Sequence, residues 1–217
     1  MSRVFDCSKD DERETGLEEA AAAVRSGELV VLPTDTVYGV GADAFLPAAI
    51  DALLTAKGRD RSMPVPVLVS SPAMLDALVD QMPETATALS QEFWPGALTL
   101  VVRHTAHLVW DLGDSRGTVA VRMPANELAQ DLISRTGPLA VSSANRSGHD
   151  PATTAMDARL QLGAAVSVYL DGGSSGGSVA STIIDVTGER PRLLRAGALD
   201  LDRVRELAPD LDTDEVG

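Results

Sequence analysis

Four polar segments of the sequence follow apolar runs and carry the side chains that could do chemistry. They are Pro33–Gly39 (PTDTVYG), Lys57–Arg59 (KGR), Ser142–Gly148 (SSANRSG) and Ser181-Thr182, with Arg195 after the next turn. Ligands of an open α/β sheet bind where its strands end, so we expect these segments to meet in one site. Arg122, at the end of a predicted strand, adds a further cation.

The side chains of these segments suit the binding of anions. Together they supply one ammonium group, three guanidinium groups and several hydroxyl and amide donors, without a catalytic nucleophile or a metal cage. Such a set neutralises a polyphosphate and orients small polar ligands. Each segment alone also fits a structural role, because its threonine, serine and asparagine side chains could cap helices or turns and its arginines could be surface charges.

Lysine is rare in this chain. Of the 18 basic residues, only Lys9 and Lys57 are lysines, and a bias toward arginine codons explains the other 16. Lys9 lies in an acidic N-terminal stretch that we expect to fray. Lys57 ends a predicted helix and begins the Lys-x-Arg segment, so it is the lysine that we single out for function.

Three familiar motifs occur without the context that each requires. Gly39–Ala44 matches G-x-G-x-x-A, but six residues separate it from the preceding strand, which argues against a dinucleotide fold. Gly172–Gly176 matches G-x-S-x-G, but all three histidines precede it, so a flexible loop is favoured over a nucleophile elbow. His104 and His107 have no metal-binding partner at a recognised spacing, which favours exposed loop histidines. No P-loop motif occurs.

Apolar runs and turn residues predict alternating helices and strands. The predicted helices span residues 17–25, 47–57, 72–79, 84–93, 127–135 and 156–162. The predicted strands span residues 29–32, 65–69, 98–102, 119–121, 139–141, 166–170, 182–186 and 192–194. The run 34–41 is predicted to be a polar turn, and Pro66 should confine its strand to a sheet edge or give it an irregular start. The order predicts an α/β fold, a twisted open mixed sheet with flanking helices.

Composition limits the class of protein. The 217 residues, 44% of them hydrophobic, can form one domain or two small ones, and we predict a single domain over 1–209 followed by a disordered acidic tail over 210–217. The net charge of −14 argues against a broad nucleic-acid surface, but the two ends carry much of it, which leaves room for a local basic cleft. The sequence has no membrane span or signal segment and a single cysteine, Cys7, so we expect a cytoplasmic protein.

Seven segments of the sequence resemble, in family order, the YrdC family of threonylcarbamoyl-AMP synthases. They are residues 32–41 (LPTDTVYGVG), 57–59 (KGR), 93–100 (FWPGALTL), 119–124 (VAVRMP), 142–148 (SSANRSG), 181–185 (STIID) and 194–195 (LR). Residues 60–66 (DRSMPVP) depart from the family pattern, in which many relatives have a proline directly after Lys-x-Arg, so the shape of that loop stays open. Longer members carry an additional C-terminal domain, for which we expect no room here.

The resemblance implies a YrdC-like fold with a deep basic cavity, and a reaction performed there. L-threonine, bicarbonate and ATP would be joined into threonylcarbamoyl-AMP with release of pyrophosphate, and Mg²⁺ would accompany the nucleotide. The product would serve the formation of N6-threonylcarbamoyladenosine in tRNA. Threonylcarbamoyl-transferase partner proteins would complete that modification, and the chain itself could contact tRNA weakly.

The same resemblance implies roles for individual residues. The catalytic residues would be Lys57 and Arg59. The ATP-binding residues would be Lys57, Arg59, Ser143, Asn145 and Arg195. The threonine-binding residues would be Thr34, Tyr38, Arg122 and Ser181, with Thr36 and Thr182 as secondary candidates. None of them is expected to hold a metal ion.

Other functions remain open at this point. A non-catalytic module could bind tRNA or duplex RNA with the same basic cavity, although the overall acidity and the lack of an RNP-like aromatic motif weigh against it. A carbamoyl-adenylate-forming module of hydrogenase maturation shares the fold but normally belongs to a much larger chain. A regulatory nucleotide binder is the third alternative.

Overall fold

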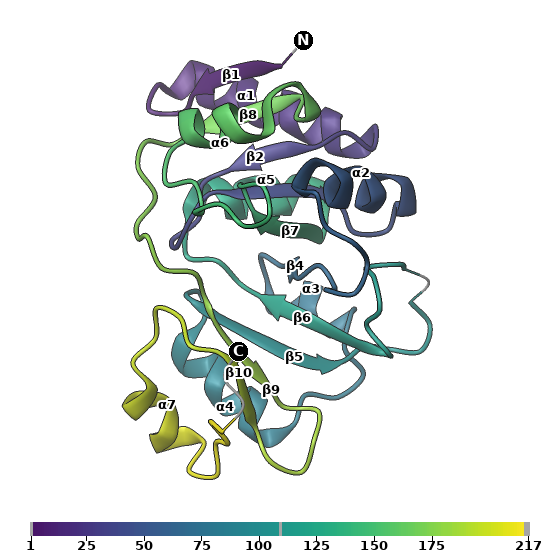
Figure 1. Cartoon of the computed structure of the whole chain (residues 1–217), viewed down its shortest axis with the longest axis vertical. Helices are drawn as coiled ribbons and strands as arrows, with labels where there is room; N and C mark the ends of the chain where they lie inside the picture. The colour runs from purple at the N-terminus through teal and green to yellow at the C-terminus, as the bar shows by residue number, and fades with distance from the viewer. Residues whose placement is uncertain (1, 109, 215–217) are drawn as a thin grey trace.

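A ten-stranded mixed sheet runs through residues 2–108 and 110–214, the part of the chain that the computed structural model describes. Its strands lie in the order β1-β8-β2-β3-β7-β4-β6-β5-β9-β10 (Figure 1). The strands are β1 (Arg3–Asp6), β2 (Val30–Leu32), β3 (Gly39–Asp43), β4 (Val67–Leu68), β5 (Leu98–Arg103), β6 (Thr118–Arg122), β7 (Leu139–Ser143), β8 (Val168–Asp171), β9 (Thr182–Asp185) and β10 (Arg192–Arg195). The pairs β1–β8, β2–β8, β4–β6 and β5–β9 are parallel and the remaining pairs antiparallel, which confirms the predicted mixed α/β sheet.

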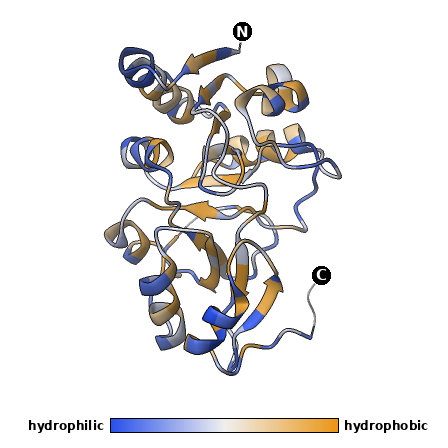
Figure 2. Ribbon diagram, turned by 90° about the vertical axis from the view of Figure 1, so that its left-hand side faces the viewer, coloured by the Kyte–Doolittle hydropathy of each residue, from blue (hydrophilic) through white to orange (hydrophobic). Residues whose placement is uncertain are grey.

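Helices cover the sheet on both faces. They are α1 (Asp10–Arg25), α2 (Pro47–Lys57), α3 (Pro72–Asp76), α4 (Glu84–Phe93), α5 (Glu127–Thr136), α6 (Ala155–Leu162), the 3-10 helix η1 (Gly163–Ala165) and α7 (Leu201–Leu207). Figure 2 shows apolar strands between helices whose outer faces are hydrophilic. Among the described residues, we find no helix with both the length and the apolar character needed to cross a lipid bilayer.

Strand β2 shows how the sequence builds two cores. Successive side chains of a strand point to opposite faces of the sheet. Val30 and Leu32 accordingly pack into the core that α1 and α5 cover, whereas Leu29 and Val31 pack into the core beneath α2 and α6. Because both faces of this strand are buried, Leu29 and the three residues of β2 form a continuous apolar run rather than an alternating one.

Some elements differ from the sequence prediction. The prediction missed β1, and it missed α7, which follows the last predicted strand. It placed the start of α1 at residue 17, although the helix begins at Asp10, because three acidic residues form a favourable first turn. It also assigned residues 39–41 to a polar turn. They belong instead to β3, whose glycines are buried between β2 and β7.

Strand β4 lies inside the sheet rather than at its edge. It pairs with β7 on one side and β6 on the other, so the proposal of an edge strand is wrong. Pro66 precedes the strand instead of interrupting it, and its carbonyl accepts the N–H of Val141 at 2.8 Å. The strand therefore has the irregular start that the proline predicted, and it is only two residues long.

The C-terminal segment is attached to the sheet as far as residue 212, and Asp214 donates its N–H to the side chain of Asp212. Leu211 is buried, and Asp212 exchanges backbone hydrogen bonds with the start of β10, through Leu193 N–H and Pro191 C=O. The predicted disordered tail therefore does not fit residues 210–214, because an apolar residue inside the acidic run anchors it. The remaining predicted tail residues, 215–217, lie outside the described residues.

Candidate functional site

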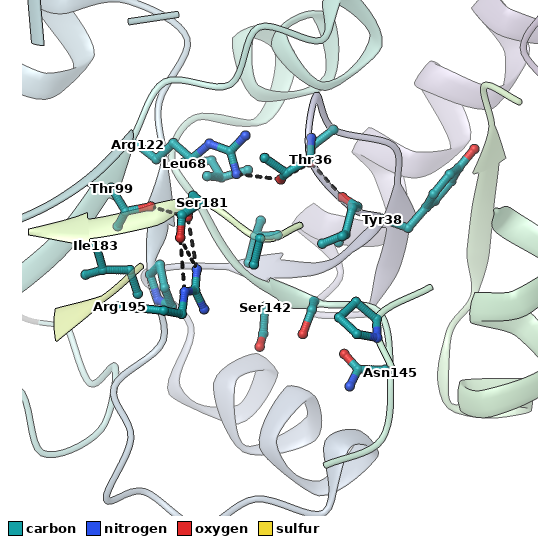
Figure 3. Close-up of a pocket in the computed structure, with 18 of the residues that line it drawn as sticks. Thr36, Tyr38, Leu68, Thr99, Arg122, Ser142, Asn145, Ser181, Ile183 and Arg195 are labelled. Carbon is teal, nitrogen blue, oxygen red and sulfur yellow. Dashed lines mark hydrogen bonds between the residues drawn. The ribbon is translucent and has the colours of Figure 1, made fainter. Parts of the chain in front are cut away.

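A cavity of about 370 Å³ lies beside the core that α1 and α5 cover, and Leu68 and Val141 belong to both. Nine of the eleven candidate residues line it: Thr34, Thr36, Tyr38, Arg59, Arg122, Ser143, Asn145, Ser181 and Arg195. They come from segments far apart in the sequence, which Figure 3 shows gathered around one space. Among the described residues, three guanidinium groups line this cavity and no carboxylate does.

Strand pairing brings the first and third polar segments together. Gly39, which begins β3, is paired with Ser143, which ends β7. The pairing is close: a Cβ on Gly39 would lie 2.5 Å from Cγ1 of Val141, so the strand can carry no side chain at this point. The turn before β3 and the segment after β7 therefore form adjacent walls of the cavity.

The turn itself is held by its two threonines. The Thr34 hydroxyl donates to Val37 C=O at 2.6 Å and accepts the N–H of Thr36 at 3.2 Å. The two hydroxyl oxygens lie 3.0 Å apart, and both side chains are buried. These contacts are those of turn residues, and they also leave both threonines in the cavity wall.

A β-bulge turns Arg195 into the cavity. In β10, Leu193 is paired with Ile184, but the next paired residue, Arg195, faces Ile183. This shift in register places Leu193 in the core with Ile184 and places Arg195 in the cavity with Ile183, although residues two apart in a regular strand share a face.

Arg195 belongs to a small hydrogen-bonded cluster. Its Nε and Nη2 donate to the backbone oxygen of Ser181 at 3.0 and 2.8 Å, and Nη2 also reaches the Ser181 hydroxyl at 3.1 Å (Figure 3). That hydroxyl lies 2.7 Å from the hydroxyl of Thr99. The guanidinium plane is thereby fixed along one edge, which orients the rest of the group toward the cavity.

Arg122 is the most enclosed of the three arginines. It donates from Nε to Gly96 C=O at 2.9 Å, from Nη1 to the Thr36 hydroxyl at 2.9 Å and from Nη2 to a carboxylate oxygen of Asp35 at 2.7 Å. Burial lowers the pKa of Arg122, and the charge of Asp35 opposes that effect. Because Asp35 neutralises it locally, Arg122 is suited to orienting a ligand more than to supplying net charge.

The other two arginines leave positive charge uncompensated in the cavity. Burial lowers the pKa of Arg195, and the nearby charges of Arg122 and Arg59 lower it further. Nε of Arg59 is buried and has no hydrogen-bond partner among the described residues. Mutual repulsion and an unsatisfied donor both favour an anionic ligand, since a bound anion would relieve them.

Tyr38 reaches away from the cavity. Its hydroxyl accepts the N–H of Gly172 at 3.1 Å and donates to Gly173 C=O at 2.5 Å, and Figure 3 shows its ring directed away from the arginines. Burial raises the pKa of this hydroxyl. The side chain therefore ties the turn to the segment after β8, and the residue meets the cavity near its backbone.

Two candidate residues do not line the cavity. Thr182 is fully buried, and its hydroxyl accepts the N–H of Leu199 at 3.1 Å. Lys57 is 1% exposed, and its ammonium group donates to the backbone oxygens of Ser143, at the end of β7, and of Asn145, just after it. Burial, and less strongly the charge of Arg59, lower the pKa of Lys57 to about 7.

Three residues of the site were absent from the set of candidates. Asp35 holds Arg122, Thr99 bonds to Ser181, and His149 lines the cavity next to Gly148. Thr99 had a recognisable signal, because it is the one polar residue inside the apolar run 98–102. Asp35 and His149 had none, since an acid in a polar turn and a loop histidine are both ordinary surface residues.

The donor set does not form a magnesium site. Mg²⁺ prefers carboxylate and water oxygens, and no carboxylate lines the described part of the cavity. Nor do the described residues contain a group of three or more histidine, cysteine, aspartate or glutamate side chains placed to hold a metal ion. These residues could accept a metal ion only as a companion of a phosphate ligand.

Comparison with known proteins identifies a family model and relatives that are similar to this chain. The family model Sua5_yciO_yrdC, described as telomere recombination, matches residues 22–197. A protein of Mycobacterium leprae is 54% identical over 207 residues, covering 95% of this chain and 94% of its own length. A protein of Pyrococcus abyssi named threonylcarbamoyl-AMP synthase is 38% identical, covering 88% of this chain.

A solved structure extends the likeness to three dimensions. The crystal structure of P. abyssi Sua5 complexed with L-threonine matches 90% of this chain with a TM-score of 0.86 and 37% identity. The chain spans 58% of that protein and 57% of the P. abyssi synthase, whereas it spans nearly all of the mycobacterial relative. The polar residues gathered in the cavity therefore lie within the region that the relatives share.

Proposed function

The chain belongs to the Sua5/YciO/YrdC family, and from this premise we propose that it is an L-threonylcarbamoyladenylate synthase. It would form threonylcarbamoyl-AMP and pyrophosphate from L-threonine, bicarbonate and ATP, which makes it a nucleotidyltransferase. The relatives named threonylcarbamoyl-AMP synthase and the Sua5 structure with L-threonine support the proposal.

The observation that carries the proposal is the charge of the cavity. A chain of net charge −14 gathers Arg59, Arg122 and Arg195 around one space without a lining carboxylate among its described residues. Asp35 offsets the charge of Arg122. Burying the like charges of Arg59 and Arg195, however, is costly unless an anionic ligand offsets their repulsion. A nucleoside triphosphate and a carbamate are two anions that would repel each other in water, and this cavity would hold both.

The reaction needs orientation and charge more than it needs a nucleophile on the protein. Threonine's amine adds to CO2 derived from bicarbonate, and a carbamate oxygen then attacks the α-phosphorus of ATP as pyrophosphate leaves. Charge grows on oxygens that are already anionic, so fixed cations stabilise the transition state. Arg59 and Arg195, with Ser143 and Asn145, would hold the nucleotide, while Mg²⁺, when bound, screens its phosphates.

Threonine would occupy the end of the cavity near Arg122. The Thr34–Thr36 turn and Ser181 offer hydroxyl groups there, and Asp35 keeps the guanidinium of Arg122 in one orientation. Apolar residues such as Leu68 and Val141 complete the wall. Such a wall excludes water, which matters because the carbamate loses CO2 once it is protonated and the mixed anhydride hydrolyses.

The product's lability also suggests where it goes. A reactive adenylate is best passed on at once, so we place this chain in the cytoplasm beside threonylcarbamoyl-transferase partner proteins that act on tRNA. A weak contact with tRNA is compatible with the acidic exterior, whereas a tight one is not.

One assay tests the proposal. The purified protein is incubated with ATP, Mg²⁺, bicarbonate and L-threonine, and the nucleotide product is identified by mass and pyrophosphate is measured. Arg59→Gln should lower kcat/KM by about 10²–10³, the usual cost of removing one preorganised charge. Arg25→Gln, at the exposed end of α1, is the matched control and should keep full activity. RNA binding with steep salt dependence and no pyrophosphate release would overturn the proposal in favour of an RNA-binding module.

A further inference from the structure

The buried ammonium group of Lys57 is fully engaged by the protein itself. Its Nζ donates to the backbone oxygen of Ser143, to the backbone oxygen of Asn145 at 2.7 Å and to the Asn145 side-chain oxygen at 3.4 Å. An ammonium group has three hydrogens, so these three acceptors use them all. A phosphate oxygen could reach Nζ only by displacing one of these bonds, and Lys57 is 1% exposed.

The backbone of Lys57 holds the same segment. Its carbonyl oxygen accepts the N–H of Ser147 at 2.8 Å. Directly after it, Gly58 adopts a left-handed conformation with φ of 67°, which ends α2 and lets the chain turn toward Arg59. The end of α2 is therefore attached at several points to the segment that follows β7.

That segment is fixed from its other side as well. Ala144 donates its N–H to Tyr38 C=O at 2.8 Å, and Asn145 donates from Nδ2 to His149 C=O at 2.6 Å. Because its amide nitrogen donates to the carbonyl oxygens of Arg146 and His149, Asn145 presents its side-chain oxygen to Lys57. Ser143 and Asn145 are thus placed in the cavity wall by contacts that lie behind it.

We propose that Lys57 is a positioning residue, whose ammonium group sets the places of Ser143 and Asn145 in the cavity rather than contacting a substrate phosphate. Arg59 is then the member of the Lys-x-Arg segment that faces the ligand. The inference deepens the proposed function and rests on it only where activity is measured. It reassigns the residue for which the resemblance implied a phosphate contact.

The first test needs no substrate. Hydrogen exchange is followed in the ligand-free protein at about pH 6, below the Lys57 pKa of about 7, so that the amine carries its three hydrogens. Lys57→Met should speed exchange over residues 143–147 by about tenfold or more while β5 keeps its protection. Lys9→Met, at the chain's other lysine, is the matched control and should change neither region.

The second test is a double-mutant cycle on product formation. If Lys57 acts through the segment, Ser143→Ala should cost little more than about twofold in kcat/KM once Lys57→Met is present, although it costs about tenfold alone. Arg59→Met removes an independent contact, so its fold-loss in kcat/KM should multiply with the fold-loss caused by Lys57→Met.

The outcomes separate the possibilities. Unchanged exchange together with multiplying losses for Lys57 and Ser143 would show a direct substrate contact and overturn the inference. Faster exchange throughout the chain would show a general loss of stability and overturn it as well. If the wild-type protein forms no adenylate, the proposed function fails, and the exchange experiment alone still decides the role of Lys57.

Discussion

Replacement of Asp35 by asparagine isolates the charge that neutralises Arg122. The variant keeps the shape of the side chain and an oxygen that can accept the N–H of Ala125, which lies 2.9 Å away. It removes the negative charge that lies 2.7 Å from the Arg122 guanidinium. Only 7% of the Arg122 side chain is exposed, so solvent cannot replace that charge.

The expected cost follows from burial. Leaving one member of a buried ion pair without its partner typically costs about 3–5 kcal/mol. Because 19% of the Asp35 side chain is exposed and asparagine keeps a hydrogen-bond acceptor, we expect about 2–3 kcal/mol of unfolding free energy. For a chain of this size, that loss corresponds to roughly 5–10 °C in Tm.

The assay is urea and thermal unfolding, with a surface pair as the control. Arg135 and Glu14 form an ion pair at 2.8 Å, with side chains 32% and 57% exposed. Glu14→Gln should therefore cost about 0.5 kcal/mol or less, since solvent and salt screen such a pair. If Asp35→Asn were no more destabilising than Glu14→Gln, the cavity would already be solvated around Arg122, and its description as an enclosed cation would fail.

Two further changes test the packing and the charge behind the site. Gly197→Ala should cost about 1–3 kcal/mol of unfolding free energy in a urea titration, because the added Cβ would lie 2.3 Å from the Ser181 carbonyl carbon. Gly188→Ala is the control and should cost little, because the atom nearest to its added Cβ is 3.7 Å away. Burial lowers the pKa of Lys57 from 10.5 to about 7, so the folded chain holds fewer protons than the unfolded chain between these values and its stability rises with pH. The unfolding free energy of the wild type should therefore gain on that of Lys57→Met by on the order of 2 kcal/mol from about pH 7 to about pH 9, whereas parallel pH dependences would refute the lowered pKa.

Proline and glycine residues at the ends of helices allowed those helices to be predicted from the sequence. Helices α2 and α4 begin and end where the sequence indicated, because Pro47 and Gly58 mark the ends of one and Pro83 precedes the other. Strand β3 could not be recognised in the same way. Its glycines have low strand propensity, and only the pairing with β2 and β7, which tolerates nothing larger beside Val141, makes them a strand.

The candidate site was predictable as a set of side chains but not as an arrangement of them. Nine of the residues predicted from the motifs line one cavity. The direction of each side chain, however, depends on contacts between segments that are distant in the sequence. Arg195 faces the cavity only because a bulge breaks the alternation of β10, and Tyr38 faces away because Gly172 and Gly173 bind its hydroxyl.

Lys57 shows what such contacts decide. A lysine beside an arginine in a polar segment suggests two cations that share one phosphate. In the fold, the lysine donates to the backbone oxygen of Ser143, at the end of β7, and to two oxygens of Asn145, whereas the buried Nε of Arg59 has no hydrogen-bond partner among the described residues. One cation therefore positions the cavity wall and the other faces the ligand. This difference depends on the tertiary structure and could not be predicted from the adjacent positions of the two residues in the sequence.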